Sequence, residues 1–121
     1  MTSFTATAGA AEMIHDTFLI VMAETTDGGT RIEFQRGLTF DSQDKASGMD
    51  TYCLCTEKGT HYGGVLGWSV SENRLRLRLD AAAAKALRLG SDVSIALEMP
   101  SQTIDVITAG IERVLEMPMS A

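Results

Sequence analysis

Hydrophobic and polar residues alternate along most of the first hundred positions of the 121-residue chain. The alternation has the two-residue period of a β-strand, whose successive side chains point to opposite faces. It predicts strands over residues 2–13, 17–23, 31–36, 51–57, 63–71, 74–79 and 92–98, the first of them bent near Gly9. Residues 17–23 (TFLIVMA) are apolar throughout, which is typical of a central strand buried on both faces.

Short polar segments between these strands have the composition of tight turns. His15 and Asp16 separate the first two strands, the segment 25–30 (TTDGGT) separates the next two, and Glu72 and Asn73 precede the Arg-Leu strand. Asp-Gly-Gly in particular supplies positive φ angles at little steric cost. The turns therefore predict antiparallel hairpins, and residues 51–57 and 63–71 are predicted to form a further hairpin with a Gly-rich arm.

Two helices are predicted near the C-terminus. Asp80 is a suitable N-cap for an Ala-rich helix over residues 81–89, which Gly90 would end in the left-handed conformation. A second helix begins at Ser101, and its apolar residues recur at helical spacing: Ile104, Ile107, Ile111, Val114 and Leu115. The whole pattern predicts an α+β fold in one domain, residues 1–121: a mainly antiparallel sheet of six to seven strands, with both helices packed on one face.

The composition is that of a folded acidic protein. Hydrophobic residues make up 45% of the chain, charged residues 21%, the formal charge is -6 and the pI is near 4.7. Negative potential repels nucleic-acid phosphates and attracts a basic protein partner. The chain has no apolar run of about 18 residues and no secretory signal pattern at its N-terminus, so we expect a cytoplasmic protein that does not enter a membrane.

The segment from Gln35 to Gly64 contains most of the unusual polar, aromatic and glycine residues. Its long connection over residues 37–50 includes Asp41, Asp44 and Asp50 against one lysine. The spacing of these acids does not match a calcium-binding loop. We therefore expect an acidic, solvent-exposed loop that meets a basic partner.

Cys53 and Cys55 are the only cysteines, and they share one face of their predicted strand. They are too few for a disulfide scaffold, so we expect reduced thiols that fill core space as small hydrophobic groups. A zinc site formed with His61 is the alternative, but a single C-x-C pair falls short of the usual zinc patterns. The sequence thus predicts no metal and no cofactor.

Several short segments, taken in their order and spacing, carry a family resemblance. They are Gln35-Arg36, Phe40-Asp41, Gln43-Asp44, Gly48-Met49-Asp50-x-Tyr52-Cys53 and Tyr62-Gly63-Gly64-Val65, followed by Trp68. Together they resemble the immunity protein 10 family of bacterial polymorphic-toxin systems. The resemblance implies a small α+β protein that binds and neutralises a cognate toxin domain, has no catalytic activity and blocks the toxin's active site or an essential surface.

Candidate partner-binding residues are the exposed acids and the aromatic and histidine residues of the same segment. They are Asp41, Asp44, Asp50, Tyr52, His61 and Tyr62. Tyr52 belongs to this set only if it is exposed, and Trp68, between strand residues, is expected in the core.

Three other hypotheses follow from the sequence. An enzyme or small-molecule-binding domain would use the acidic loop, the His61-Tyr62-Gly63-Gly64 arm and Arg36, and a cleft that joins His61, Asp50 and Arg36 would favour it. A homodimer would pair copies through Met117 to Met119. The outward arginines of residues 74–79 (RLRLRL) would hold an acidic ligand or phosphate, although solvation or pairing with neighbouring carboxylates is the more common fate of such a face.

Overall fold

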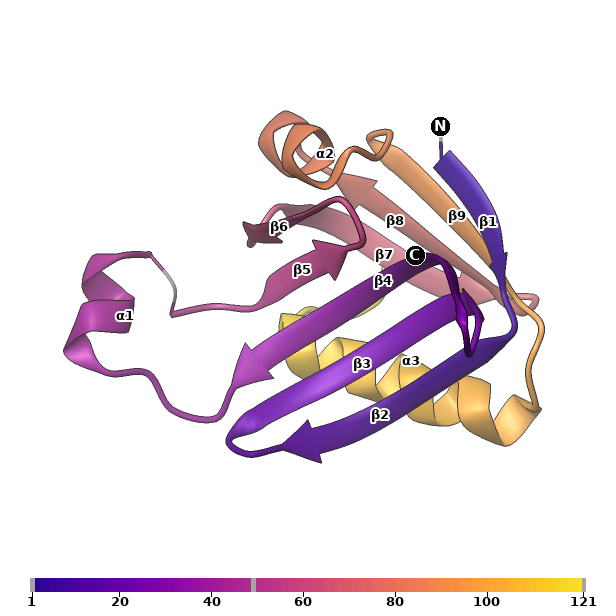
Figure 1. The fold of residues 1–121 in the computed structure, drawn as a ribbon, viewed down its shortest axis with the longest axis horizontal. Coiled ribbons are helices and arrows are strands. Elements are labelled where there is room, and N and C mark those ends of the chain that lie inside the picture. The colour runs from indigo at the N-terminus through magenta and orange to yellow at the C-terminus, as the bar shows by residue number, and fades with distance from the viewer. Residues whose placement is uncertain (1, 49, 121) are drawn as a thin grey trace.

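A computed structural model describes residues 2–48 and 50–120 of the chain. In this part of the protein nine strands and three helices follow one another (Figure 1). The elements are β1 (Thr2–Ala6), β2 (Ala8–Ile14), β3 (Thr17–Thr25), β4 (Gly28–Gly37), α1 (Ser42–Ala46), β5 (Cys53–Thr56), β6 (Gly59–Tyr62), β7 (Val65–Ser71), β8 (Arg74–Leu79), α2 (Ala81–Leu87), β9 (Asp92–Leu97) and α3 (Ser101–Leu115).

The strands form two sheets that share one core. The four-stranded sheet has the order β1-β9-β8-β7, and the five-stranded sheet has the order β2-β3-β4-β5-β6. Neighbouring strands are antiparallel except β1 and β9, which are parallel. The α+β class is confirmed, but the prediction of a single sheet of six to seven strands was wrong. Two sheets form because the chain crosses between them at two points.

The first crossing divides the predicted strand 2–13 at Thr7. Just before it, the backbone N–H of Glu98 donates to the carbonyl of Ala6 at 2.9 Å, which holds β1 in the four-stranded sheet. At the next residue, the N–H of Thr7 donates to the carbonyl of Ala23 at 3.0 Å, which starts the five-stranded sheet. The bend thus lies two residues before Gly9.

The second crossing is made by Gly63 and Gly64, whose φ angles are 72° and 99°. These left-handed conformations suit glycine because it lacks a Cβ atom. The sequence predicted a hairpin between residues 51–57 and 63–71, and this prediction was wrong. Residues 59–62 form the additional strand β6 beside β5, and the glycines then turn the chain so that β7 pairs with β8 in the other sheet.

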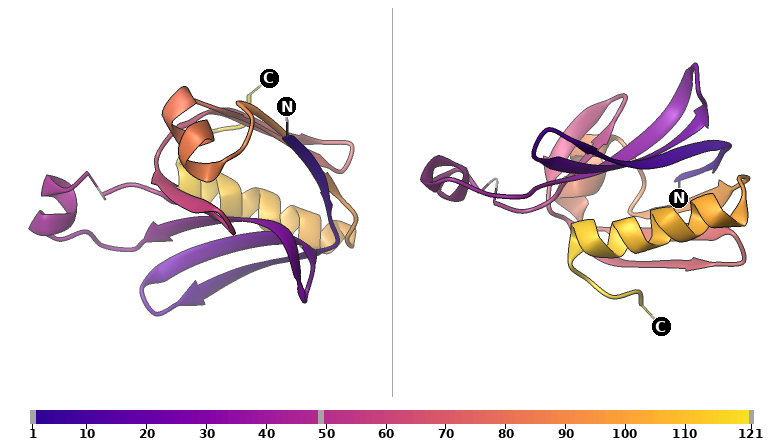
Figure 2. Two further views of the ribbon diagram at one scale, coloured as in Figure 1. Left: turned by 45° about the horizontal axis from the view of Figure 1, so that its top comes forward. Right: turned by 90° about the horizontal axis from the view of Figure 1, so that it is seen from below.

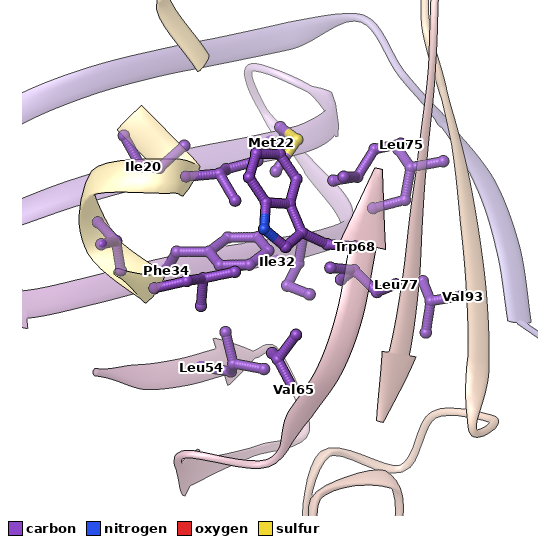
Figure 3. Close-up of a cluster of buried hydrophobic side chains, with 14 of the residues drawn as sticks. Ile20, Met22, Ile32, Phe34, Leu54, Val65, Trp68, Leu75, Leu77 and Val93 are labelled. Carbon is purple, nitrogen blue, oxygen red and sulfur yellow. The ribbon is translucent and has the colours of Figure 1, made fainter. Parts of the chain in front are cut away.

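The core lies between the inner faces of the two sheets and α3 (Figures 1 and 2). The predicted apolar stripe of α3 is buried along its whole length. Trp68 stands at the centre of this core, 2% exposed, as expected (Figure 3). Its indole N–H donates to the carbonyl of Met117 at 2.9 Å, so the large ring is buried without an unpaired donor.

The helix α2 covers the ends of β5 and β6. Asp80 caps it as predicted, since its Oδ1 accepts a hydrogen bond from the N–H of Ala83 at 2.8 Å. The helix is two residues shorter than predicted. Arg88, with φ of 56°, takes the left-handed terminal conformation that the sequence assigned to Gly90.

Candidate partner-binding face

The five-stranded sheet has one face that no helix covers in the part of the chain that the structure describes. The helix α3 packs against β2, β3 and β4 from the core side, where α2 also meets β5 and β6 (Figure 2, right). The opposite side, here called the open sheet face, is formed by two rows of residues that lie in register across the strands. These rows are Ala10-Val21-Glu33-Cys55-Thr60 and Glu12-Leu19-Gln35-Cys53-Tyr62.

The open sheet face corrects two expectations. Leu19 and Val21 are half-buried rather than enclosed, because β3 has core on one face only. Cys53 and Cys55 lie on the opposite face of β5 from Leu54, which is fully buried in the core; Cys53 is nevertheless buried, and Cys55 is half-buried. The alternation of β5 shows which residues share a face. It does not show which face is turned to the core, because both faces carry apolar or weakly polar side chains.

The cysteines are free thiols, as predicted, with their Sγ atoms 4.0 Å apart. Gln35 lies beside them and donates from Nε2 to the Sγ of Cys55 at 3.6 Å. Burial, with a smaller contribution from Cys55, raises the pKa of Cys53 to about 12. The Cys53 thiol is therefore protonated at neutral pH and unsuited to nucleophilic attack.

His61 lies on the other face of β6. It is in register with Leu54, and its Nδ1 is 3.2 Å from the carbonyl oxygen of Gly63. The imidazole cannot reach the thiols through the sheet, so His61, Cys53 and Cys55 are not arranged to bind a zinc ion together. Over residues 2–48 and 50–120, no three His, Cys, Asp or Glu side chains lie close enough together to hold a metal ion.

The predicted acidic loop contains the short helix α1, which the sequence did not indicate. With its flanking residues it projects from the body of the protein and forms the α1 arm, which comprises residues 38–48, 50 and 51 (Figure 1). Asp41 and Asp44 form a capping box: Asp41 Oδ1 accepts from the N–H of Asp44 at 2.8 Å, and Asp44 Oδ2 accepts from the N–H of Asp41 at 3.0 Å. No residue of α1 is buried. Asp50 is exposed on the returning segment, and Met49, part of the family resemblance, is outside the described residues.

A polar hollow of about 360 Å³ lies where the α1 arm meets the open sheet face. Its lining includes Asp16, Gln35, Phe40, Asp44, Cys53 and Tyr62. Tyr62 is 41% exposed, and partial burial, followed by the two thiols and Asp44, raises its pKa. The carboxylates of Asp16 and Asp44 thus border the hollow, together with the neutral phenol of Tyr62.

Arg36 also borders this hollow, but its guanidinium binds the end of α3. Its Nε donates to the carbonyl of Val114 at 2.6 Å, and its Nη1 forms an ion pair with Glu116 at 2.8 Å. A cation at the C-terminus of a helix offsets the partial negative charge there. His61 and Asp50 do not line the hollow, so the cleft that would favour an enzyme is not assembled.

The six candidate residues therefore lie in three places. Asp44 and Tyr62 border the hollow, and Asp41 and Asp50 lie on the α1 arm beside it. Tyr52 is 7% exposed, and its hydroxyl accepts a hydrogen bond from the N–H of Val65 at 2.9 Å, so this side chain belongs to the core. His61 faces inward. The half-exposed apolar residues of β3 complete the surface, and no sequence signal distinguished them from core.

These features define a small α+β protein with an uncovered, acidic sheet face and a projecting arm at its side. The model of the immunity protein 10 family matches residues 5–105, and the chain belongs to this family. The family indicates an immunity role rather than an enzymatic one. No curated protein matches the chain. In the described residues, no helix has the length and apolar character needed to cross a membrane.

Proposed function

We propose that this protein neutralises a cognate toxin domain in the cytoplasm by binding it with the open sheet face and the α1 arm. Bound there, it covers the toxin's active site or a surface that the toxin needs. One observation carries this proposal: a sheet face left uncovered by helices, beside an arm whose helix has no buried residue. Membership of the immunity protein 10 family supports a toxin as the partner.

The charges on this side of the molecule favour a basic partner. Glu12, Asp16 and Asp44 lie on or beside the open sheet face, and Asp41 and Asp50 extend the negative charge along the arm. The nearby cation Arg31 is already paired with Glu33, at 2.8 Å between Nε and Oε2. Like-signed charges around one surface accelerate the encounter with a positively charged partner.

The same face also offers apolar anchorage. Small side chains of β2 and β3 line an open hollow of about 460 Å³ near the turn between β3 and β4, including Ala8, Ala10, Val21 and Ala23. A hollow of this kind can receive a large apolar or aromatic side chain of the partner, the type of contact that carries most binding energy in protein interfaces. The acidic residues therefore attract the partner, and the hollow lined by small side chains receives one of the partner's apolar side chains.

The first test is co-expression with a candidate toxin domain, chosen from the genes next to the gene of this protein. We expect rescue of growth and co-purification of the two proteins. A Leu19→Arg variant, altered in the middle of the open sheet face, should lose both. Val106→Arg is the matched control, because Val106 is 53% exposed on α3, away from that face. Equal loss in both variants, or no binding together with turnover of a small substrate, would refute the proposal.

The double variant D41N/D44N tests the acidic arm separately. Asparagine keeps the capping of α1 while removing two negative charges. We expect association with the toxin to slow by about threefold to tenfold at low salt, with the difference shrinking as salt is added. D105N/E112Q removes two exposed carboxylates from α3 and is the control of equal charge. If the two double variants slow association equally, the arm has no specific part in it.

A further inference from the structure

The outer face of the four-stranded sheet is basic, although the protein as a whole is acidic. Arg74, Arg76 and Arg78 point outward from β8, while the leucines between them are buried in the core. Alternate residues of an antiparallel strand are about 6.8 Å apart, since each residue rises about 3.4 Å. The arginines thus form a straight row, here called the arginine row.

The arginine row stands on a floor of small side chains. In register beside it are Ser71, Ser69 and Gly67 on β7, and Ala96, Ser94 and Asp92 on β9. Arg74 donates from Nη1 to the Oγ of Ser94 at 2.8 Å, and Arg78 extends across Gly67, where a Cβ atom would lie 3.7 Å from its Nη2. The strand residues beside the row are therefore small, and Ser120 of the C-terminal segment lies next to Arg78 at Gly67, where a Cβ atom would be 2.8 Å from its Oγ.

Over residues 2–48 and 50–120, the arginines of the row take part in no ion pair. In the described residues none of these arginines has a carboxylate oxygen within 4.0 Å, and Asp92 is the one acid in register beside them. Arg76 and Arg78 are exposed to solvent, which confirms the expectation of solvation but not that of ion pairing. Three positive charges against one negative charge occupy a face of a protein whose net charge is -6.

A shallow hollow of about 180 Å³ marks where a ligand would sit, and its polar lining consists of Ser69, Arg76, Arg78, Ser120 and the one carboxylate, Asp92. A guanidinium presents a planar fork of N–H donors that matches a carboxylate. Binding to single-stranded nucleic acid relies on aromatic stacking, and the residues in register on this face include no aromatic side chain. The geometry therefore favours carboxylates over nucleotides.

We propose that the arginine row is a second docking surface, which binds an extended protein segment with acidic residues at alternate positions. Such a segment repeats at the same spacing as the arginines, so each carboxylate meets one guanidinium. The two sheets turn their outer faces away from each other (Figure 2), so this surface and the open sheet face can be occupied together. The inference does not depend on the toxin-binding proposal.

The test is fluorescence anisotropy with a labelled Glu-Thr-Glu-Thr-Glu-Thr peptide and the full-length protein. We expect saturable binding that weakens with salt, and a loss of at least about tenfold in affinity for R76E/R78E. K58E/K85E changes the net charge equally at exposed lysines near α2 and should bind as the wild type does. Circular dichroism verifies the fold of each variant, and R76Q/R78Q replaces R76E/R78E if the latter does not fold.

Four results would overturn this inference. The first is no binding, or binding by the Gln-Thr peptide as strong as by the Glu-Thr peptide. The second is binding of Glu-Glu-Glu-Thr-Thr-Thr as strong as that of the alternating peptide, which would show that the spacing of the acidic residues does not matter. The third is equal competition by inorganic phosphate or oligothymidylate, which would indicate a general anion surface. The fourth is equal loss in K58E/K85E, which would reduce the effect to net charge. Toxin binding by R76E/R78E, measured in parallel, should be unchanged.

Discussion

At the scale of single residues, the hydroxyl of Tyr52 links the two sheets. Tyr52 precedes β5 of the five-stranded sheet and accepts a hydrogen bond from the N–H of Val65, the first residue of β7 in the four-stranded sheet. Tyr52→Phe leaves this buried N–H without a partner. We expect the free energy of unfolding to fall by about 1–3 kcal/mol, measured by urea denaturation.

Tyr62→Phe is the control for this change. Tyr62 is 41% exposed, so the loss of its hydroxyl should alter the free energy of unfolding by less than about 0.5 kcal/mol. A Tyr52→Phe effect no larger than that of Tyr62→Phe would show that the hydrogen bond between the sheets adds no stability.

The ionisation of Cys53 makes the free energy of unfolding depend on pH in the alkaline range. Burial raises its pKa from an ordinary value of 9.0 to about 12. The folded protein therefore holds the thiol proton more tightly than the unfolded chain does. Stability is unaffected below about pH 9, and it falls as the pH rises from about 9 to 12, because the unfolded chain releases the proton first.

Denaturation at a series of pH values would measure this decline. Cys53→Ala should make it shallower, because the titrating group is gone. Part of the decline should remain, since burial also raises the pKa of Tyr52. An identical pH profile in the two proteins would contradict the assignment to Cys53.

At the scale of elements, α2 lies against β6 at a glycine. A Cβ atom built on Gly59 would overlap the backbone carbonyl oxygen of Ala86, which cannot move without displacing the helix. We expect Gly59→Ala to lower the free energy of unfolding by about 1–3 kcal/mol, with a matching fall in melting temperature. Gly37→Ala is the control. A Cβ atom at Gly37 would lie 3.4 Å and 3.5 Å from its nearest neighbours, which is ordinary van der Waals contact, so the free energy of unfolding should hardly change. Equal losses of stability in Gly59→Ala and Gly37→Ala would show that α2 can shift to accommodate the added methyl group.

The elements differ in how far the sequence predicted them. The five buried residues of the α3 stripe and the complete Arg-Leu alternation of β8 were visible because each is long and strictly periodic. The helix α1 was missed because five residues are too few to show a period. Its cap was nevertheless readable as acids three residues apart, Asp41 and Asp44. The strand β6 was hidden among turn residues, since Gly59 to Tyr62 contains one glycine and no apolar alternation.

At the scale of the whole molecule, the segment after α3 covers an open sheet edge. The backbone of Ser120 donates to the carbonyl of Trp68 at 2.8 Å, and the N–H of Val70 lies 3.3 Å from the sulfur of Met119. An uncovered edge strand offers unpaired N–H and C=O groups to other chains. The methionines that suggested a homodimer are thus engaged along β7 of their own chain.

A chain that ends at Glu116 tests this covering. It leaves the β7 edge bare and the indole N–H of Trp68 without the carbonyl of Met117. We expect a loss of about 1–3 kcal/mol in the free energy of unfolding and self-association that grows with concentration, measured by light scattering after size exclusion. If Met117 to Met119 joined two copies instead, the full-length chain would associate and the shortened one would not.

The candidate site shows the same division between pattern and packing. The sequence predicted exposed acids in the long connection, and Asp41 and Asp50 are indeed exposed, because the solvation of carboxylates in a polar loop is a local property. It grouped His61 and Tyr62 although neighbouring strand residues face opposite ways, and it assigned Leu19 and Val21 to the core. The first error overlooks the alternation of strand residues, while the second concerns which face of β3 is covered, and that depends on where α3 packs.

Local period, turn chemistry and composition were sufficient to predict the α+β class, most strands, the two longer helices, the Asp80 cap and the acidic character. The sequence also carried the family resemblance, which the match over residues 5–105 confirms. The division into two sheets, the position of Cys53 and Cys55 on the open sheet face and the separation of the acidic and basic faces were not predictable from the sequence. Those properties depend on contacts between residues distant in sequence, such as β1 with β9 and α3 with β3, which no local pattern encodes.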